Sequence, residues 1–238
     1  MKRLPWSLQT RNKPGFSPPT YAFAPTKKNR HPCRFGAFWF DLSVEHQLNS
    51  ELERQTTQQP NPLRVMFEQI ERLIETSGLQ WTFLRPGMFA ANSLSWWAPQ
   101  IRVGDVVRWP HLAAPTAPID ERDIAAVAVR ALCEDGHAGA EYVLTGPESL
   151  SQFEQVSTIG RVIGRSLRIV EISPDEARRE LLRIGPLPAV NMLLEAWAAA
   201  MGQPAHVTST VAEITGAPAM TFLQWATDNL QSFGRDRA

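Results

Sequence analysis

The sequence predicts an α/β protein with a mostly parallel sheet and a small helical cap at its C-terminal end. Three observations lead to this fold class. An amphipathic helical pattern is followed by a short Ser-Gly turn and a strand pattern between residues 60 and 86. Strand and helix patterns then alternate over residues 103–185, as expected for parallel strands joined by helices. Residues 187–238 contain helical patterns only, which predicts the cap.

The first expected element is a strand over residues 35–42, where "FGAFWFDL" is rich in aromatic residues. The clearest helix covers residues 60–80, with Asn61 as its N-cap and Pro62 at its first helical position. Gly78 is expected to end this helix, as glycines commonly do. The expected apolar face consists of Leu63, Met66, Phe67, Ile70, Leu73 and Ile74.

The later elements follow from the same patterns. A strand over residues 79–86 ends at a Pro-Gly turn, and a helix is expected to follow it over residues 89–97. Another helix is expected to begin at Asp120 as N-cap, with Asp123 at its third helical position. The remaining strands are expected over residues 103–110, 139–148 and 166–173, and the remaining helices over residues 149–165, 173–185, 187–202 and 218–233.

Composition indicates a globular protein of ordinary type. Hydrophobic residues make up 43% and charged residues 20% of the chain. No apolar run approaches the roughly 18 residues that a membrane span needs. Cys33 and Cys133 are the only cysteines and lie far apart, which favours a reducing, cytoplasmic compartment over a disulfide framework.

The first forty residues differ from the rest of the chain. They contain eight basic and no acidic residues, although the whole chain has 24 of each, and they also contain six prolines. Three accounts compete: a targeting peptide, a tail that contacts nucleic acid, and a segment that is not a native part of the fold. Scattered basic residues and dense prolines weaken the first two. We therefore expect residues 1–40 to be a disordered or non-native leader and residues 41–238 to form the domain.

Residues that commonly carry hydrolytic or metal chemistry do not form recognisable patterns. The histidines His46, His111, His137 and His206 lack ligand spacing, so no metal site is predicted. No serine lies in a GxSxG motif, which weighs against an α/β-hydrolase. Asp120 and Asp123 could form a carboxylate pair, but helix capping explains them more simply.

Four stretches together carry a family likeness. They are "IETSGLQWTFLRPGMFAAN", "IDERDIAAVAVRAL", "YVLTGPESLSQFEQVSTIGRVIGR" and "ITGAPAMTFLQWATDN". In this order they resemble the NmrA-like branch of the atypical short-chain dehydrogenase/reductases, over most of the chain from about residue 42. The resemblance implies a Rossmann fold that binds NADP or NAD, and an NAD(P)H-dependent oxidoreductase acting on quinone or azo-type substrates. Some NmrA-like proteins instead sense nicotinamide redox state by binding, so a non-enzymatic regulator is the alternative.

The resemblance also implies where the cofactor lies. The backbone after the strand at 79–86 would lie near the nicotinamide, so Pro86, Gly87, Met88 and Phe89 are the expected cofactor-binding residues. The other interpretation of this turn is purely structural, with Arg85 in a surface ion pair. No catalytic residue is expected, and the expected partner is a small, possibly aromatic substrate, with neither membrane nor nucleic acid.

Two parts of the family pattern are missing. No GxGxxG or GxxGxxG motif, which would cradle the pyrophosphate, occurs anywhere in the chain. The family's Tyr-x-x-x-Lys pair is replaced by Phe67 and Glu71, although the NmrA-like branch commonly lacks that pair too. Truncation, which would replace the first half of the Rossmann sheet by the leader, explains the missing phosphate loop. Cofactor binding would then be impaired, or the chain would be an inactive fragment.

Tryptophans gather around the Pro-Gly turn in sequence. Trp81, Trp96, Trp97 and Trp109 could line a pocket for an aromatic substrate, or they could be part of the core. If half of the sheet is absent, a third alternative is that they are left partly exposed and promote self-association.

Overall fold

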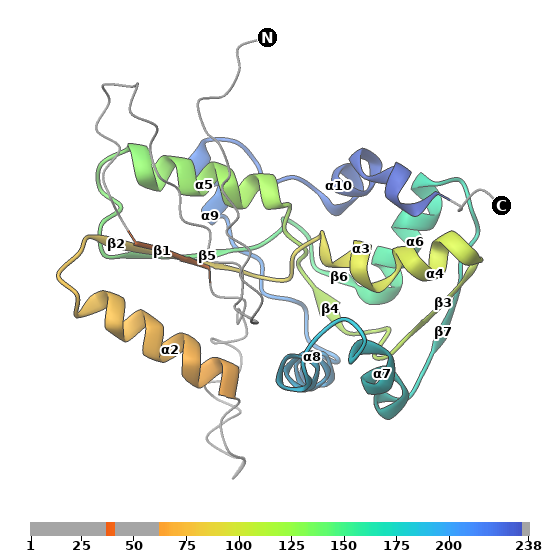
Figure 1. Cartoon of the computed structure of the whole chain (residues 1–238). Coiled ribbons are helices and arrows are strands. Elements are labelled where there is room, and N and C mark those ends of the chain that lie inside the picture. Colours follow the sequence, from red (N-terminus) through yellow and green to blue (C-terminus); the bar gives the residue numbers. More distant parts are fainter. Residues whose placement is uncertain (1–36, 41–61, 235–238) are drawn as a thin grey trace.

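The computed structural model describes residues 37–40 and 62–234, and these form two regions that lie side by side (Figure 1). The first, which we call the sheet region, is built on three parallel strands in the order β1-β2-β5. Their bounds are Ala37–Phe40 for β1, Trp81–Pro86 for β2 and Ala140–Leu144 for β5. The expected α/β class with parallel strands is therefore confirmed.

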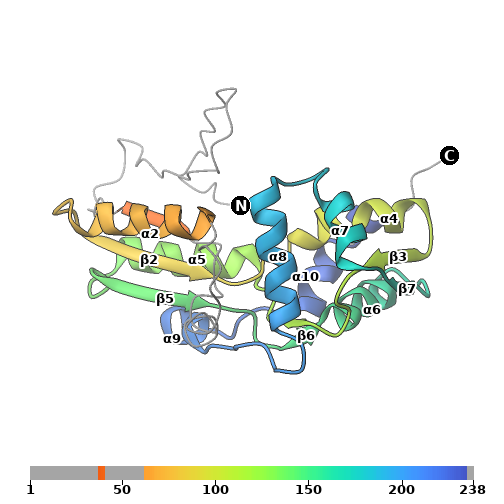
Figure 2. The same cartoon turned by 90° about the horizontal axis from the view of Figure 1, so that it is seen from below.

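Helices cover both faces of this sheet. Helix α2 (Pro62–Glu75) lies on one face, and α5 (Glu121–Cys133) and α9 (Thr210–Thr215) lie on the other (Figures 1 and 2). Sequence patterns located α2 and α5 but not α9, which is short. Asp120 caps α5 as expected, because its side chain accepts a hydrogen bond from the Arg122 backbone N–H.

The second region, which we call the tryptophan region, surrounds a core of indole rings. It contains a parallel pair of strands, β3 (Val106–Trp109) and β7 (Arg168–Glu171). A short antiparallel pair, β4 (Pro115–Thr116) and β6 (Leu150–Ser151), lies close to the sheet region. Its helices are α3 (Asn92–Trp96), α4 (Ala98–Val103), α6 (Gln152–Val162), α7 (Pro174–Leu181), α8 (Leu187–Ala199) and α10 (Phe222–Asp228), followed by the 3₁₀ helix η2 (Leu230–Phe233).

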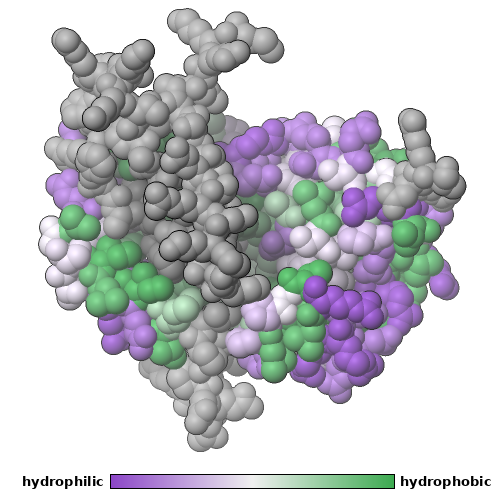
Figure 3. Space-filling model, viewed as in Figure 1, coloured by the Kyte–Doolittle hydropathy of each residue, from purple (hydrophilic) through white to green (hydrophobic). Residues whose placement is uncertain are grey.

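The cap is therefore larger than the sequence patterns predict. Segments on both sides of the sheet region's last strand contribute to it, since α3, α4, β3 and β4 come from residues 92–116 and the remainder from residues 150–233. Figure 3 shows hydrophilic and apolar side chains interspersed over the visible surface of this region. The sequence patterns did not assign residues 92–116 to this region, because short helices interrupted by loops carry too little periodicity to be assigned to a core.

Two helix predictions need correction. The single helix expected over residues 89–97 is two short helices, and Phe89 itself forms a β-bridge with Ile119. On α2, the expected apolar residue Leu73 is 69% exposed, whereas Glu71 is buried. An ion pair with Arg85, described below, holds Glu71 on the face that packs against the sheet. Asn61 and the side chain of Leu63 lie outside the described residues.

Tight glycines shape two of the connections. In α6, a Cβ on Gly160 would lie 2.9 Å from the Arg165 carbonyl oxygen, so this glycine permits close packing. After β5, a Cβ on Gly146 would lie only 2.0 Å from the carbonyl oxygen of Pro118. The turn after β5 is thus pressed against the segment that leads into α5, and only glycine fits there.

Candidate functional site

The Pro-Gly turn lies where β2 ends, at the carboxyl edge of the three-stranded sheet. Ligands of open α/β sheets bind at this edge. Pro86 and Gly87 are buried, whereas the side chains of Met88 and Phe89 are half-buried. Met88 and Phe89 are therefore the parts of the expected site that can contact a ligand, and Pro86 and Gly87 serve as its backbone support.

Backbone hydrogen bonds hold this turn on two sides. The Gly87 N–H donates to the Leu144 carbonyl oxygen at 2.8 Å, which fixes the turn to the end of β5. The Ile119 N–H donates to the Met88 carbonyl oxygen at 2.9 Å, and the Ala90 N–H donates to the Ile119 carbonyl oxygen at 2.8 Å. We call residues 86–90 the rim. Its conformation is held by these bonds to β5 and to the segment before α5.

The segment before α5 is itself fixed to the turn after β5. The Gly146 N–H donates to the Ala117 carbonyl oxygen at 3.1 Å, next to the close approach at Pro118. Three chain segments, after β2, before α5 and after β5, therefore meet in one rigid edge. Sequence reasoning located the first of them and missed the other two, although the Gly-Pro pair after β5 was a turn signal.

A strap between α8 and α9 also crosses the end of β5. The Thr208 N–H donates to Thr145 Oγ1 at 2.9 Å, and Thr208 Oγ1 donates to the Val143 carbonyl oxygen at 3.0 Å. Thr145 is buried. No periodic pattern marks this strap in the sequence, so it was not predicted.

Arg85 is an internal cross-link next to the rim. Its Nε and one terminal nitrogen donate to the two carboxylate oxygens of Glu71 at 3.2 and 2.8 Å, and its other terminal nitrogen donates to Glu141 at 2.6 Å. The guanidinium thus ties α2 and β5 to β2. The ion-pair interpretation of Arg85 is confirmed, and the pairing is partly buried rather than superficial.

Asn92 and Asp123 have structural contacts. The Asn92 side-chain amide donates to the Met88 sulfur at 3.2 Å, across the start of α3. Asp123 does not form a carboxylate pair for chemistry; its Oδ2 accepts a hydrogen bond from the Met220 N–H at 2.8 Å. Burial raises the pKa of this carboxyl group, which the Met220 hydrogen bond partly offsets.

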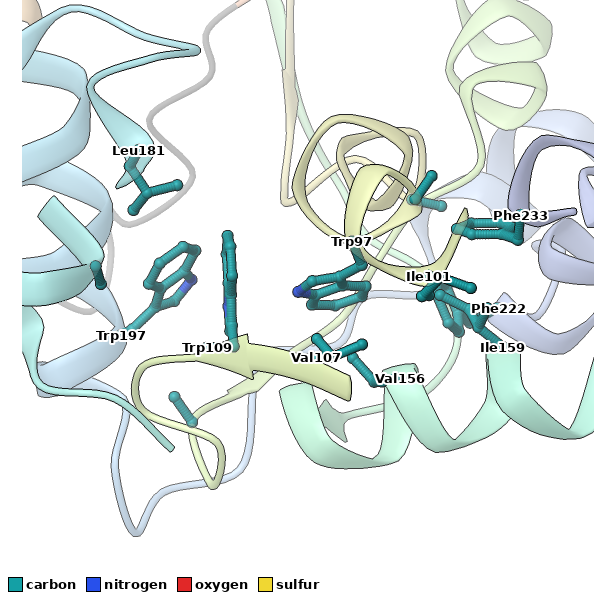
Figure 4. Close-up of a cluster of buried hydrophobic side chains, with 14 of the residues drawn as sticks. Trp97, Ile101, Val107, Trp109, Val156, Ile159, Leu181, Trp197, Phe222 and Phe233 are labelled. Atoms are coloured by element: carbon teal, nitrogen blue, oxygen red, sulfur yellow. The ribbon is translucent and has the colours of Figure 1, made fainter. Parts of the chain in front are cut away.

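The tryptophans belong to the core beside the rim. Trp97 and Trp109 are buried, and Trp109 packs between Trp97 and Trp197 of α8 at ring-centroid distances of 5.8 and 5.5 Å (Figure 4). Trp96 contacts all three rings at 5.4 to 6.0 Å. Trp81 does not join them and instead stacks on Phe83 at 4.3 Å. The core interpretation holds for Trp97 and Trp109. Trp81 and Trp96 are both half-buried, and of these two only Trp96 belongs to the cluster beside the rim.

The described residues fit one end of a dinucleotide and not the other. Two half-buried apolar side chains on a rigid edge suit a nicotinamide ring. The helix that begins at this edge, α5, carries Glu121 and Asp123 in its first turn after an Asp120 cap. Carboxylates there disfavour a phosphate group. Within residues 37–40 and 62–234 we find no helix N-terminus with a glycine-rich turn that would cradle a pyrophosphate.

The chain is similar in sequence to curated reductases. The protein is 43% identical over 164 residues to (4-alkanoyl-5-oxo-2,5-dihydrofuran-3-yl)methyl phosphate reductase of Streptomyces griseus. It is 36% identical over 166 residues to the NAD(P)H azoreductase of Xenophilus azovorans. These matches cover 68% and 69% of this chain, and 58% of each relative. The chain thus spans less than two thirds of the curated relatives it matches, and no protein-family model matches it.

Solved structures share its fold. The NADPH-dependent quinone oxidoreductase QOR2 of Escherichia coli superposes with a TM-score of 0.63 at 21% identity, over 80% of this chain and 66% of that one. The triphenylmethane reductase of Citrobacter sp. superposes with a TM-score of 0.58 at 16% identity, over 71% of this chain and 60% of that one. The chain therefore has the Rossmann-like fold that these two structures share. No described helix is long and apolar enough to cross a membrane.

Proposed function

We propose that the protein is an NmrA-like, NAD(P)H-dependent oxidoreductase that reduces conjugated acceptors of the quinone or azo type. The observation that carries the proposal is the rigid rim, which presents Met88 and Phe89 at the carboxyl edge of a Rossmann-like sheet. A reduced nicotinamide supplies a hydride when bound. The named activities of the two curated relatives, an azoreductase and a furanone reductase, support this reaction class.

The residues on α2 favour acceptors that need no protein acid. Phe67 and Glu71 stand where the resemblance would put the tyrosine and lysine of short-chain dehydrogenases. Phe67 has no proton to give, and Glu71 is bound through both carboxylate oxygens to Arg85. Simple ketones need a proton donor during reduction. Quinones and azo compounds place the arriving electron pair on an electronegative atom within a conjugated system, and that atom can take its proton from solvent.

The chain's own residues would position the nicotinamide and the substrate. The Gly87–Leu144 and Met88–Ile119 hydrogen bonds fix the rim, so Met88 and Phe89 form a preformed apolar surface for a flat ring. The half-buried Trp96 belongs to the neighbouring tryptophan region and is the aromatic candidate for contact with substrate. Because the phosphate-binding motif is missing, we propose that the dissociation constant for the dinucleotide is above the micromolar range. We also propose that the protein is cytoplasmic.

The test is an anaerobic assay of the purified chain with millimolar NADPH or NADH. A naphthoquinone and an azo dye are offered as acceptors, and nicotinamide oxidation is followed by absorbance. Phe89→Ala is compared with Phe153→Ala, a matched control whose ring is 52% exposed on α6 in the tryptophan region. We expect Phe89→Ala to raise the KM for the dinucleotide about tenfold, the effect of losing roughly 1.4 kcal/mol of ring contact.

Three outcomes discriminate between the accounts. Activity that Phe89→Ala weakens and Phe153→Ala leaves unchanged supports the proposal. Dinucleotide binding without turnover of either acceptor favours the non-enzymatic sensor. If a folded sample neither binds nor oxidises either dinucleotide, the oxidoreductase proposal is wrong and the inactive-fragment interpretation stands.

A further inference from the structure

The first turn of α5 makes an unusual set of contacts with a segment almost a hundred residues later. Asp123 Oδ2 accepts from the Met220 N–H at 2.8 Å, Glu121 Oε2 accepts from the Trp225 indole N–H at 3.2 Å, and Arg122 pairs with Asp228 at 2.8 Å. All three partners belong to residues 217–228, which we call the C-terminal segment. One helical turn thus holds this segment at three points.

These contacts differ in strength. Arg122 and Asp228 are each about half exposed, so their pair contributes little. Asp123 is 8% exposed, and its carboxylate accepts the hydrogen bond that the Met220 N–H would otherwise donate to water. Losing a buried acceptor leaves the amide hydrogen unsatisfied, which is costly. Asp123 is therefore the central contact of the three.

The residues just before this first turn of α5 are bonded to the rim. The Asp120 side chain caps α5, and the preceding residue, Ile119, exchanges backbone hydrogen bonds with Met88 and Ala90. A shared hydrophobic cluster makes a second connection. Phe89 of the rim and Ala219 of the C-terminal segment both pack against the buried cluster that contains Leu84, Ile119, Ile124, Val127, Ala128, Leu144 and Val211.

We propose that Asp123 is a positioning residue: by anchoring Met220 it closes the C-terminal segment over this cluster and fixes Phe89 at the rim. The role of Phe89 as a cofactor contact rests on the proposed function. The coupling between Asp123 and the position of Phe89 does not depend on it. Asp123 acts through Ala219 and Phe89 and touches no ligand itself. The C-terminal segment, whose helix α10 packs on α6 of the tryptophan region, thereby adds to the backbone bonds that hold the rim in the sheet region.

The test compares amide hydrogen exchange in three variants of the full chain. Asp123→Ala removes the acceptor, Asp123→Asn keeps an oxygen for the Met220 N–H, and Leu181→Ala removes a buried side chain of the tryptophan region as a control for general destabilisation. Exchange is measured at the amides of Ala90 and Ile119, which form the two hydrogen bonds between the rim and the segment before α5. If Asp123→Ala does not fold, Asp123→Ser, whose shorter side chain withdraws the acceptor from the Met220 N–H, replaces it.

We expect Asp123→Ala to accelerate exchange at Ala90 and Ile119 about tenfold, with wild-type rates restored in Asp123→Asn and no rim-specific change in Leu181→Ala. Acceleration confined to residues 217–228, or an equal effect in Leu181→Ala, would overturn the proposal. Dinucleotide titrations of the same variants separate it from the proposed function. If the chain binds no dinucleotide but Asp123→Ala accelerates exchange at the rim specifically, the cofactor assignment is wrong and the coupling is supported.

Discussion

The sheet region and the tryptophan region are held together by different interactions. At the rim of the sheet region, backbone groups of three chain segments bond to one another, and Gly146 allows an approach that no other residue permits. The tryptophan region relies on side chains. Hydrogen bonds between backbones fix positions closely, whereas packed rings contribute more free energy and tolerate small shifts. The comparison indicates that the sheet region positions the site and the tryptophan region stabilises the fold.

Trp109 shows how far the second region depends on rings. Its indole N–H donates to the buried side chain of Gln152. The indole nitrogens of Trp97 and Trp197 have no hydrogen-bond partner among the described residues, and Figure 4 shows both directed at Trp109 from opposite sides. An aromatic face is a weak acceptor for such buried donors. Trp109 thus satisfies two neighbours with its faces and one with its edge.

The largest predicted effect is on stability in the tryptophan region. Trp109→Leu should lower the free energy of unfolding by about 3–5 kcal/mol, because it opens a cavity and leaves two indole donors without a ring face. Trp109→Phe keeps an aromatic face and should cost less. Urea denaturation followed by circular dichroism measures both. Equal losses in the two variants would show that the ring faces contribute nothing beyond volume.

Gly146→Ala should lower the free energy of unfolding less than Trp109→Leu does, but it should change the position of the rim more. The new methyl group would overlap the Pro118 carbonyl oxygen and force the segment before α5 away from the rim, at a cost of about 1–3 kcal/mol. Gly104→Ala is the control, since a Cβ there meets no atom within 4 Å. If exchange at the rim amides is unchanged in a folded Gly146→Ala sample, backbone contact does not set the rim's position.

Helix capping in α6 gives a third, local effect. Ser151 and Glu154 form a reciprocal capping box, and Ser151→Ala should cost about 1 kcal/mol. Hydrogen bonds from the Ser151 hydroxyl and backbone lower the pKa of Glu154. A lowered pKa means that the contribution is complete above the unfolded-state pKa and is lost as pH falls through the folded-state value. Urea titrations at neutral and acid pH test this: the cost of Ser151→Ala should fall at acid pH to the part that comes from the Glu154 N–H bond to the Ser151 hydroxyl, which does not titrate. A cost that is the same at both pH values would contradict the account.

The smallest effect is expected for the exposed pair of Arg122 and Asp228. Asp228→Asn should change the free energy of unfolding by less than about 0.5 kcal/mol, because both side chains remain largely in water. Thermal unfolding at low and high salt is sufficient to measure it. A change above about 1 kcal/mol would show that this outer contact, rather than Asp123, holds the C-terminal segment.

The long periodic elements could be predicted from the sequence because their signals are local. Asp120 caps α5 as its position predicted, and the strand ending at Pro86 has its expected bounds within two residues. The strand expected over residues 35–42 is present at 37–40, and its ends lie outside the described residues. The division at residue 40 and the account of residues 1–40 as a leader stay predictions.

The parts that escaped prediction depend on tertiary contacts. Leu73 fits the helical period of α2 but faces solvent, because the sheet-facing side of that helix holds Glu71 for Arg85. Trp197 joins Trp97 and Trp109 from a hundred residues away, which no local pattern encodes. Pro86 to Phe89 were identified by resemblance alone, and their role in binding a cofactor stays a proposal; their rigidity became visible only with the segments at Ile119 and Leu144.

The most direct test of the central claim is to locate dinucleotide binding on the folded chain. NADPH and NADH are titrated to millimolar concentration while amide exchange or amide chemical shifts are recorded along the backbone. We predict weak binding with protection centred on Gly87 to Ala90 and no comparable change around Trp97 in the core. Protection at another surface, or no binding by a chain shown to be folded, would contradict the assignment of the rim as a nicotinamide site.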